Sequence, residues 1–153
     1  VVGSFGEEAA IVEFSTIEAA EEAVSMLNHA LLGGKTCRCF SATLLETIVH
    51  TMDDGHRVVV EGLDLSIDAR GLQDLFALFG TVFDCKVELD AQERSRGIGF
   101  VHFATESEAL KAIGFLSGTR VGASQVLVRR FGLADEGLFS GCLYDCPATR
   151  AAA

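Results

Sequence analysis

The residue types that could do chemistry in this chain gather in one stretch, Arg96 to Phe103. Aromatic and branched side chains interleave with glycine there, a pattern typical of a β-strand. Because side chains alternate across a strand, Gly99, Val101 and Phe103 would face a core. The opposite face would carry Arg96, Ile98, Phe100 and His102. An aromatic ring near a cation on an open sheet face can stack a single-stranded base and bind its phosphate.

The elements around this stretch follow one order over residues 57–131. Strands are predicted at 58–60, 82–89, 97–103 and 125–130, and a helix is predicted at about 106–117. Asp68 caps another helix, and Gly80 stands where its C-terminal cap belongs. That helix has one apolar face, made of Leu72, Leu75, Phe76 and Phe79. The order βαββαβ predicts an α+β protein with a ferredoxin-like sandwich.

An offset of 89 residues aligns a shorter copy of the same pattern, with Phe14 on Phe103 and Thr16 on Thr105. This first copy contains a strand at 9–14, a helix at 16–29 and a strand at 36–41. Both helices have a capping-box start signal, Ser15 with Glu18 and Thr105 with Glu108. A period of this length is typical of tandem domains.

The domain organisation follows from the repeat. Residues 1–42 are expected to be the remnant of a truncated copy, in which two strands lack the strand between them. We expect this remnant to be poorly ordered without a partner, or to pack on the intact domain by an irregular route. Residues 43–56 link the copies and include a short amphipathic helix, formed by Leu44, Leu45, Ile48 and Val49. Residues 132–153 are expected to be a loose tail.

Residues 57–131 resemble the RNA recognition motifs of cytoplasmic poly(A)-binding proteins, most closely the second of their four tandem motifs. The resemblance is carried by the octamer Arg96 to Phe103. It is also carried by the run Leu63 to Asp68, by Phe79-Gly80, and by Cys85-Lys86-Val87. The half-copy before it would then be the end of a first motif.

Several positions depart from the family pattern. The first strand has Val59 where the family has a stacking aromatic, Glu61 where a basic residue is common, and Gly62 where Asn is usual. The octamer has Ile98 at its other stacking position. In the first copy, the octamer positions 7–14 have lost both stacking aromatics, so we expect no RNA binding from that half.

The resemblance implies a set of RNA-binding residues on the sheet face. Phe100 would stack a base, the cations would meet phosphates or base edges, and His102 would add a hydrogen bond. The predicted set is Phe100, Arg96, Ile98, His102, Val59, Lys86, Leu127 and Arg129. Three simpler interpretations remain open: Phe100 is covered by the linker or tail, Arg129 and Arg130 are only solvated charges at the strand end, and His102 is a passive surface residue.

Composition limits the other function classes. The net charge of −10 argues against indiscriminate phosphate binding, but residues 1–56 hold 9 acidic and 2 basic side chains, whereas residues 57–134 hold 10 and 9. The sequence shows no catalytic triad and no phosphate-binding loop, so we expect a binding protein without a cofactor rather than an enzyme. The lone Cys142–Cys146 pair makes a metal site improbable, and the cysteines are expected to be reduced thiols. No apolar run is long enough for a membrane span.

Two hypotheses follow. The first is single-stranded RNA binding in mRNA metabolism or translation, with poly(A) and translation or mRNA-processing proteins as partners and a cytoplasmic, also nuclear, location. The alternative is a degenerate motif that binds proteins, through an apolar face made of Val59, Ile98, Phe100 and Leu127. The cations around Phe100 favour RNA, and the acidic N-terminal half favours the alternative.

Overall fold

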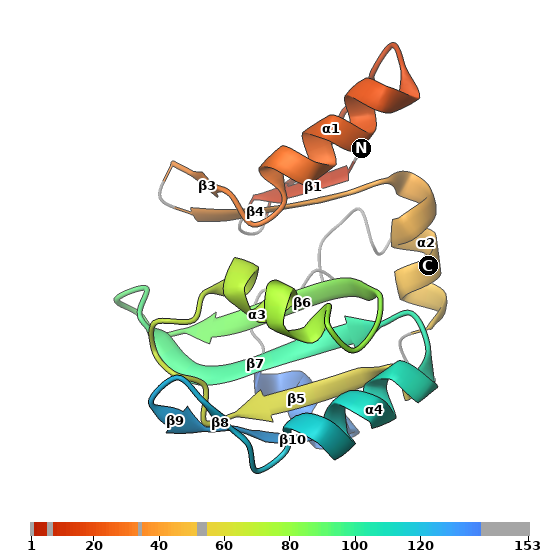
Figure 1. Ribbon diagram of the computed structural model, residues 1–153. Helices are drawn as coiled ribbons and strands as arrows, with labels where there is room; N and C mark the ends of the chain where they lie inside the picture. The colour runs from red at the N-terminus through yellow and green to blue at the C-terminus, as the bar shows by residue number, and fades with distance from the viewer. Residues whose placement is uncertain (1, 6–7, 34, 52–54, 139–153) are drawn as a thin grey trace. The chain divides into compact units, whose positions relative to one another are not determined.

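The computed structural model describes residues 2–5, 8–33, 35–51 and 55–138 of the 153-residue chain. The chain divides into two compact units, and the boundary lies between His50 and Thr51 (Figure 1). Each unit is described by itself. Throughout the described ranges, every helix is too short or too polar to cross a membrane.

The second unit is built on a four-stranded antiparallel sheet with the order β10-β5-β7-β6. The strands are β5 (Arg57–Glu61), β6 (Val82–Leu89), β7 (Ser95–Phe103) and β10 (Leu127–Arg130). Helices α3 (Ala69–Phe76) and α4 (Glu106–Leu116) lie on the same side of this sheet, as Figure 1 shows. A short hairpin, β8 (Arg120–Val121) and β9 (Ser124–Gln125), precedes β10. The predicted ferredoxin-like α+β fold is confirmed.

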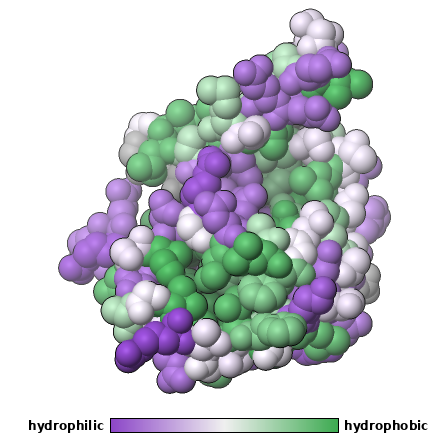
Figure 2. Space-filling model, in the orientation of Figure 1, coloured by the Kyte–Doolittle hydropathy of each residue, from purple (hydrophilic) through white to green (hydrophobic). Residues whose placement is uncertain are grey.

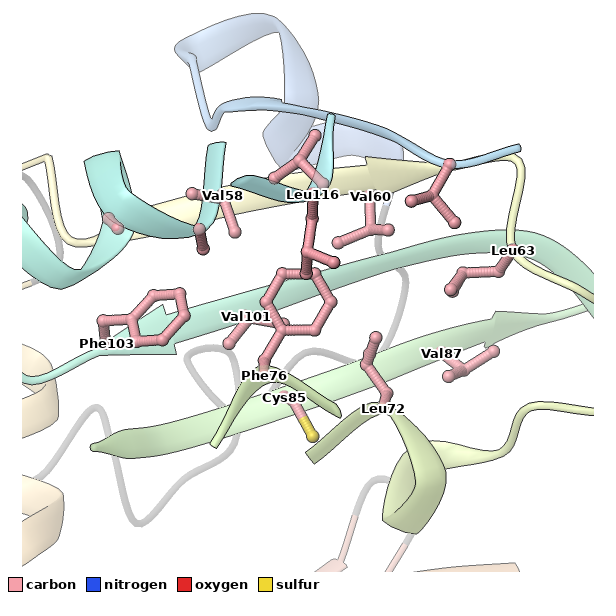
Figure 3. Close-up of a cluster of buried hydrophobic side chains, with 14 residues drawn as sticks. Val58, Val60, Leu63, Leu72, Phe76, Cys85, Val87, Val101, Phe103 and Leu116 are labelled. Atoms are coloured by element: carbon pink, nitrogen blue, oxygen red, sulfur yellow. The ribbon is translucent and has the colours of Figure 1, made fainter. Parts of the chain in front are cut away.

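The core of this unit lies between the sheet and the two helices. Phe76 and Phe103 are fully buried there, with ring centroids 6.2 Å apart (Figure 3). The predicted apolar face of α3 is confirmed, because Leu72 and Phe76 are buried and Leu75 and Phe79 pack against the cluster. Val58, Val60, Val101 and Phe103 contribute the core side of β5 and β7, as alternation predicts. The other side chains of these strands lie on the opposite face.

Helix starts in this unit follow the sequence signals. The Asp68 carboxylate accepts a hydrogen bond from the Gly71 amide at 2.8 Å. At α4, Thr105 and Glu108 form the predicted capping box. The prediction for Gly80 was wrong, because α3 ends at Phe76 with Ala77 as its C-cap. Gly80 is instead a point of close approach, where a Cβ would lie 2.5 Å from the Glu108 side chain.

The first unit has a sheet with the order β2-β1-β4-β3. Its elements are β1 (Val2–Phe5), β2 (Glu8–Ile11), α1 (Ile17–Leu27), β3 (Leu31–Leu32), β4 (Lys35–Phe40) and α2 (Ala42–His50). The expectation that two strands lack a strand between them was wrong, because β1 pairs antiparallel with both β2 and β4. The predicted linker helix is present as α2.

The cap of α1 also differs from the prediction. Thr16, rather than Ser15, is the N-cap, and its hydroxyl accepts a hydrogen bond from the Ala19 amide at 3.2 Å. The same offset that aligns Thr16 with Thr105 therefore aligns the two caps. A hydroxyl can satisfy a first-turn amide from either position in sequence, and local backbone geometry decides between them.

The cysteines and the tail are the last features that can be compared with the sequence predictions. Cys37, Cys39 and Cys85 are buried free thiols, with the sulfurs of Cys37 and Cys39 3.5 Å apart. Burial is the largest cause that raises the pKa of Cys39 to about 11. Cys142 and Cys146 lie outside the described residues. The tail is not loose throughout, because residues Leu133–Leu138 form a 3-10 helix, η1.

Candidate functional site on the sheet face

The face of the second sheet opposite α3 and α4 brings most of the predicted residues together. Its central row runs straight across the four strands: Lys86 pairs with Phe100, Phe100 with Val59, and Val59 with Arg129. Neighbouring strands lie about 4.8 Å apart, so this row spans roughly 14 Å between the outer two backbones. An aromatic ring and an aliphatic side chain thus lie between two cations.

Two further rows flank the central one. On one side, His102 pairs with Asp84 and with Arg57. On the other side, Glu61 pairs with Ile98 and with Leu127. Val126 and Val128 belong to the core, so the intervening Leu127, which is 51% exposed, lies on the open face.

Arg96 is the one predicted residue outside these rows. Val87 pairs with Gly99 and Leu89 with Ser95, so residues 96–98 of β7 oppose a single residue of β6. Gly97 has φ +71°, a left-handed conformation typical of a β-bulge. Arg96 is exposed, but alternation does not extend through a bulge. Its role at the face stays a prediction.

Gly62 shows why one departure from the family pattern is compatible with the fold. Its φ is +71°, and an added Cβ would lie 2.4 Å from the Gln125 carbonyl oxygen. Asparagine tolerates the left-handed conformation better than most residues, but it would still bring that Cβ. The close approach of the two backbones therefore favours glycine here.

Phe100 is buried in the structure, with 1% of its surface exposed. The Phe131 ring lies against it, with centroids 6.2 Å apart and planes at 74°. The Arg57 guanidinium in turn lies 4.1 Å above the centre of the Phe131 ring. The simpler interpretation had the linker or tail over Phe100, whereas the ring against it is Phe131, the last residue of the predicted domain. A base could stack on Phe100 only after that ring became accessible.

His102 is fully buried as well. Its Nε2 lies 2.9 Å from the Thr51 hydroxyl, and the His56 and Phe83 rings are within 6.2 Å. Burial, with smaller electrostatic contributions from Arg57 and His56, lowers the pKa of His102 to about 3. The imidazole is therefore neutral at physiological pH and held by its neighbours.

The cations of the face are paired with acids. Lys86 Nζ lies 3.6 Å from Glu88 Oε2. Arg129 forms a bidentate ion pair with Asp135, at 2.7 and 2.8 Å, and approaches Glu61 at 3.5 Å. The hydrogen bond from Arg129 lowers the pKa of the Asp135 carboxyl, and the same pair raises the pKa of Arg129. A phosphate would have to compete with these carboxylates.

Sequence reasoning missed four residues of the face: Arg57, Asp84, Phe131 and Asp135. Asp84 could have been found by alternation along β6, since it lies two residues before Lys86. Arg57 could have been found by extending the predicted strand 58–60 by one residue. It lies two residues before Val59 and therefore on the same face. Phe131 follows β10 directly, and its amide donates to the Arg57 carbonyl at 3.0 Å, which continues the strand pairing. Asp135 had no signal in the sequence, because its role depends on how the chain turns after Gly132.

The helix side of the same unit has a different character. Figure 2 shows this side, where green apolar atoms gather over α3 beside purple hydrophilic ones. Phe79 and Phe115 stack with centroids 6.1 Å apart, and Phe115 remains 70% exposed. In the part of the chain that the structure describes, no three metal-binding side chains converge. The sheet face is therefore the site with the best-defined arrangement of side chains.

Comparison with known proteins identifies the class. The family model of the RNA recognition motif matches residues 58–127, which include both helices, strands β6 and β7, nearly all of β5 and the first residue of β10. Two solved structures share the fold. The RNA15 RRM has TM-score 0.51 and 21% identity, covering 54% of this chain and 97% of that one. The Rna15 RRM with bound RNA (GU) has TM-score 0.50 and 22% identity, covering 55% of this chain and 92% of that one. Residues 58–127 belong to the RNA recognition motif family.

The curated relatives are polyadenylate-binding proteins. The cytoplasmic and nuclear polyadenylate-binding protein of Eremothecium gossypii is 34% identical over 119 residues, 78% of this chain and 20% of the relative. Polyadenylate-binding protein 2 of Arabidopsis thaliana is 36% identical over 120 residues, again 78% of this chain and 19% of the relative. The chain thus spans about a fifth of these relatives' length. The expected resemblance to poly(A)-binding proteins is confirmed.

Proposed function

We propose that residues 57–131 bind single-stranded RNA on the open face of the β10-β5-β7-β6 sheet. The observation that carries the proposal is the central row, in which Phe100 and Val59 lie between Lys86 and Arg129. This arrangement supplies an aromatic plane for a base and a cation on either side for the phosphates. Membership of residues 58–127 in the RNA recognition motif family supports the same role.

The affinity should be low for a domain of this kind. Base stacking contributes about 1–3 kcal/mol per base, and aliphatic side chains, Val59 and Ile98, hold two of the three stacking positions. The loss is therefore at most about 2–6 kcal/mol, or roughly 30-fold to more than 10⁴-fold in affinity. Aliphatic contact with the bases recovers part of it. The carboxylates paired with Lys86 and Arg129 weaken phosphate binding further.

The ligand class follows from the relatives. They are named polyadenylate-binding proteins, so oligo(A) is the first RNA to test, and a role in mRNA metabolism or translation is proposed with it. Protein partners from those processes and a cytoplasmic or nuclear location belong to the same proposal. The proposed activity is binding without catalysis. A protein-docking face is less well supported, because the cations Lys86 and Arg129 flank Phe100 and Val59 in the central row.

Fluorescence anisotropy with labelled oligo(A), oligo(U) and oligo(C) tests the proposal on the full chain. We expect weak binding that Phe100→Ala reduces at least about fivefold, because the stacking plane is lost. Phe115→Ala removes an equally large but 70% exposed ring from α4 and should leave binding unchanged. Lys86→Gln should weaken binding and flatten its salt dependence, since each cation engaged adds about −0.7 to the log–log slope.

Two results would contradict the proposal. One is an absence of binding to any of the three oligonucleotides at millimolar protein. The other is equal binding by wild type, Phe100→Ala and Lys86→Gln, with thermal melts showing that the variants are folded. A preference for oligo(A) over oligo(C) would support the assignment to poly(A).

A further inference from the structure

The residues that follow β10 turn back onto the proposed RNA-binding face. In Figure 1 the short helix η1 lies behind the sheet, on the side away from α3 and α4. Residues 131–138, which we name the strap, begin with Phe131, and its ring lies edge-on to Phe100. The Arg57 guanidinium also contacts this ring, 4.1 Å from its centre. The strap thus meets the one aromatic residue on which the proposed stacking depends.

The strap also forms an ion pair with a cation of the same row, Arg129. Both oxygens of Asp135 accept hydrogen bonds from the Arg129 guanidinium, at 2.7 and 2.8 Å. Asp135 Oδ2 accepts a further bond from the Gly132 amide, and the Asp135 amide donates to the Gly132 carbonyl, so a tight turn presents the carboxylate. Asp135 is 5% exposed. A bidentate carboxylate on arginine has the geometry with which arginine binds a phosphate.

We propose that the strap is an intramolecular competitor of RNA, which occupies the base-stacking position with Phe131 and the phosphate position with Asp135. This inference rests on the proposed function, because it assigns a regulation to the same face. RNA binds when the strap leaves Phe100 and Arg129. The apparent RNA affinity is therefore the affinity of the open molecule multiplied by the fraction of molecules in which the strap has left.

The contacts of the strap suit reversible release. Gly132, Leu133 and Ala134 are exposed, and Leu133 is 85% exposed. Over residues 131–135, the side chains that contact the face are Phe131 and Asp135, an aromatic pair and a partly exposed ion pair. Interactions of these two kinds are individually modest, so an open state populated at about one to twenty per cent is expected. Loss of the strap should then raise the RNA affinity by about 5-fold to 100-fold.

Binding of labelled oligo(A) to full-length variants provides the test. Asp135→Asn and Phe131→Ala should each bind about fivefold or more tightly than wild type. Asp74→Asn is the matched control for the first variant, because it removes the same charge from the exposed side of α3. Leu133→Ala is the control for the second, since it truncates an exposed side chain of the strap. Both controls should bind as wild type does.

A readout independent of affinity is the hydrogen exchange of the Asp135 amide of the strap. The Phe131 amide donates to Arg57 and the Asp135 amide to Gly132. Saturating oligo(A) should speed the exchange of the Asp135 amide in wild type. If the strap variants bind oligo(A) equally or more weakly than wild type, or if this amide stays protected in the complex, the strap is not a competitor. If wild type and all variants fail to bind RNA, the proposed function fails and the inference fails with it.

Discussion

At the scale of single residues, alternation along the strands located the candidate site, and neighbours from outside the strands decided what each side chain does. Alternation along each strand puts Phe100, Val59 and Lys86 on one face, and the pairing of β5, β7 and β6 puts them in one row. That part of the site could be predicted from sequence. The cover on Phe100 and the burial of His102 could not, because they depend on residues that reach the face from other segments, Phe131 and Thr51.

His102 provides a prediction about stability and pH. The pKa of its imidazole is lowered to about 3 in the folded state from its ordinary value of 6.5, mainly by burial. Between these two values the unfolded chain binds a proton that the folded chain does not, so the free energy of unfolding should fall as pH falls below 6.5. The slope from this one group reaches about 1.4 kcal/mol per pH unit.

Urea unfolding at several pH values between 7.5 and 4.5 measures this effect, with His102→Gln as the comparison. Glutamine can still bond Thr51 but cannot titrate, so the variant should show a shallower loss of stability with acid. Parallel pH profiles for wild type and His102→Gln would show that His102 does not carry the effect.

At the scale of elements, the pattern predicted from sequence was most accurate where local signals and packing agree. The strands and helices of residues 57–131 lie close to their predicted positions because apolar periodicity and caps point to the same boundaries. The errors have local causes. Gly80 was assigned to a cap because it follows an apolar helix face, but it serves a close approach to Glu108. The 3-10 helix of the tail has no apolar period that could have revealed it.

The capping box of α4 leads to a prediction at this scale. Thr105 accepts from the Glu108 amide at 3.2 Å, and Glu108 accepts in return from the amides of Thr105 and Thr81. Thr105→Ala leaves a first-turn amide without its partner and should lower the free energy of unfolding by about 1 kcal/mol. Ser107→Ala, at an exposed position of the same helix, is the control. Equal stability of the two variants in urea unfolding would contradict the assigned role of the cap.

At the scale of the whole molecule, charge and fold have to be reconciled. The chain has a net charge of −10, yet the proposed RNA face carries three cations, Arg57, Lys86 and Arg129. Acidic neighbours pair with Lys86 and Arg129, and Arg57 lies over the Phe131 ring, so long-range attraction of RNA is weak and contact geometry must supply the affinity. We therefore expect an RNA recognition motif with an intact fold and one aromatic stacking residue. Its sheet face must be uncovered before RNA binds to it.

The most direct test of RNA binding through this face is an NMR titration of the full chain with oligo(A), followed in its amide spectrum. We expect the largest shifts at Lys86, Phe100, Val59 and Arg129, with α3 and α4 nearly unchanged. Shifts confined to the helix side, around Phe79 and Phe115, or an unchanged spectrum at millimolar oligo(A), would contradict it.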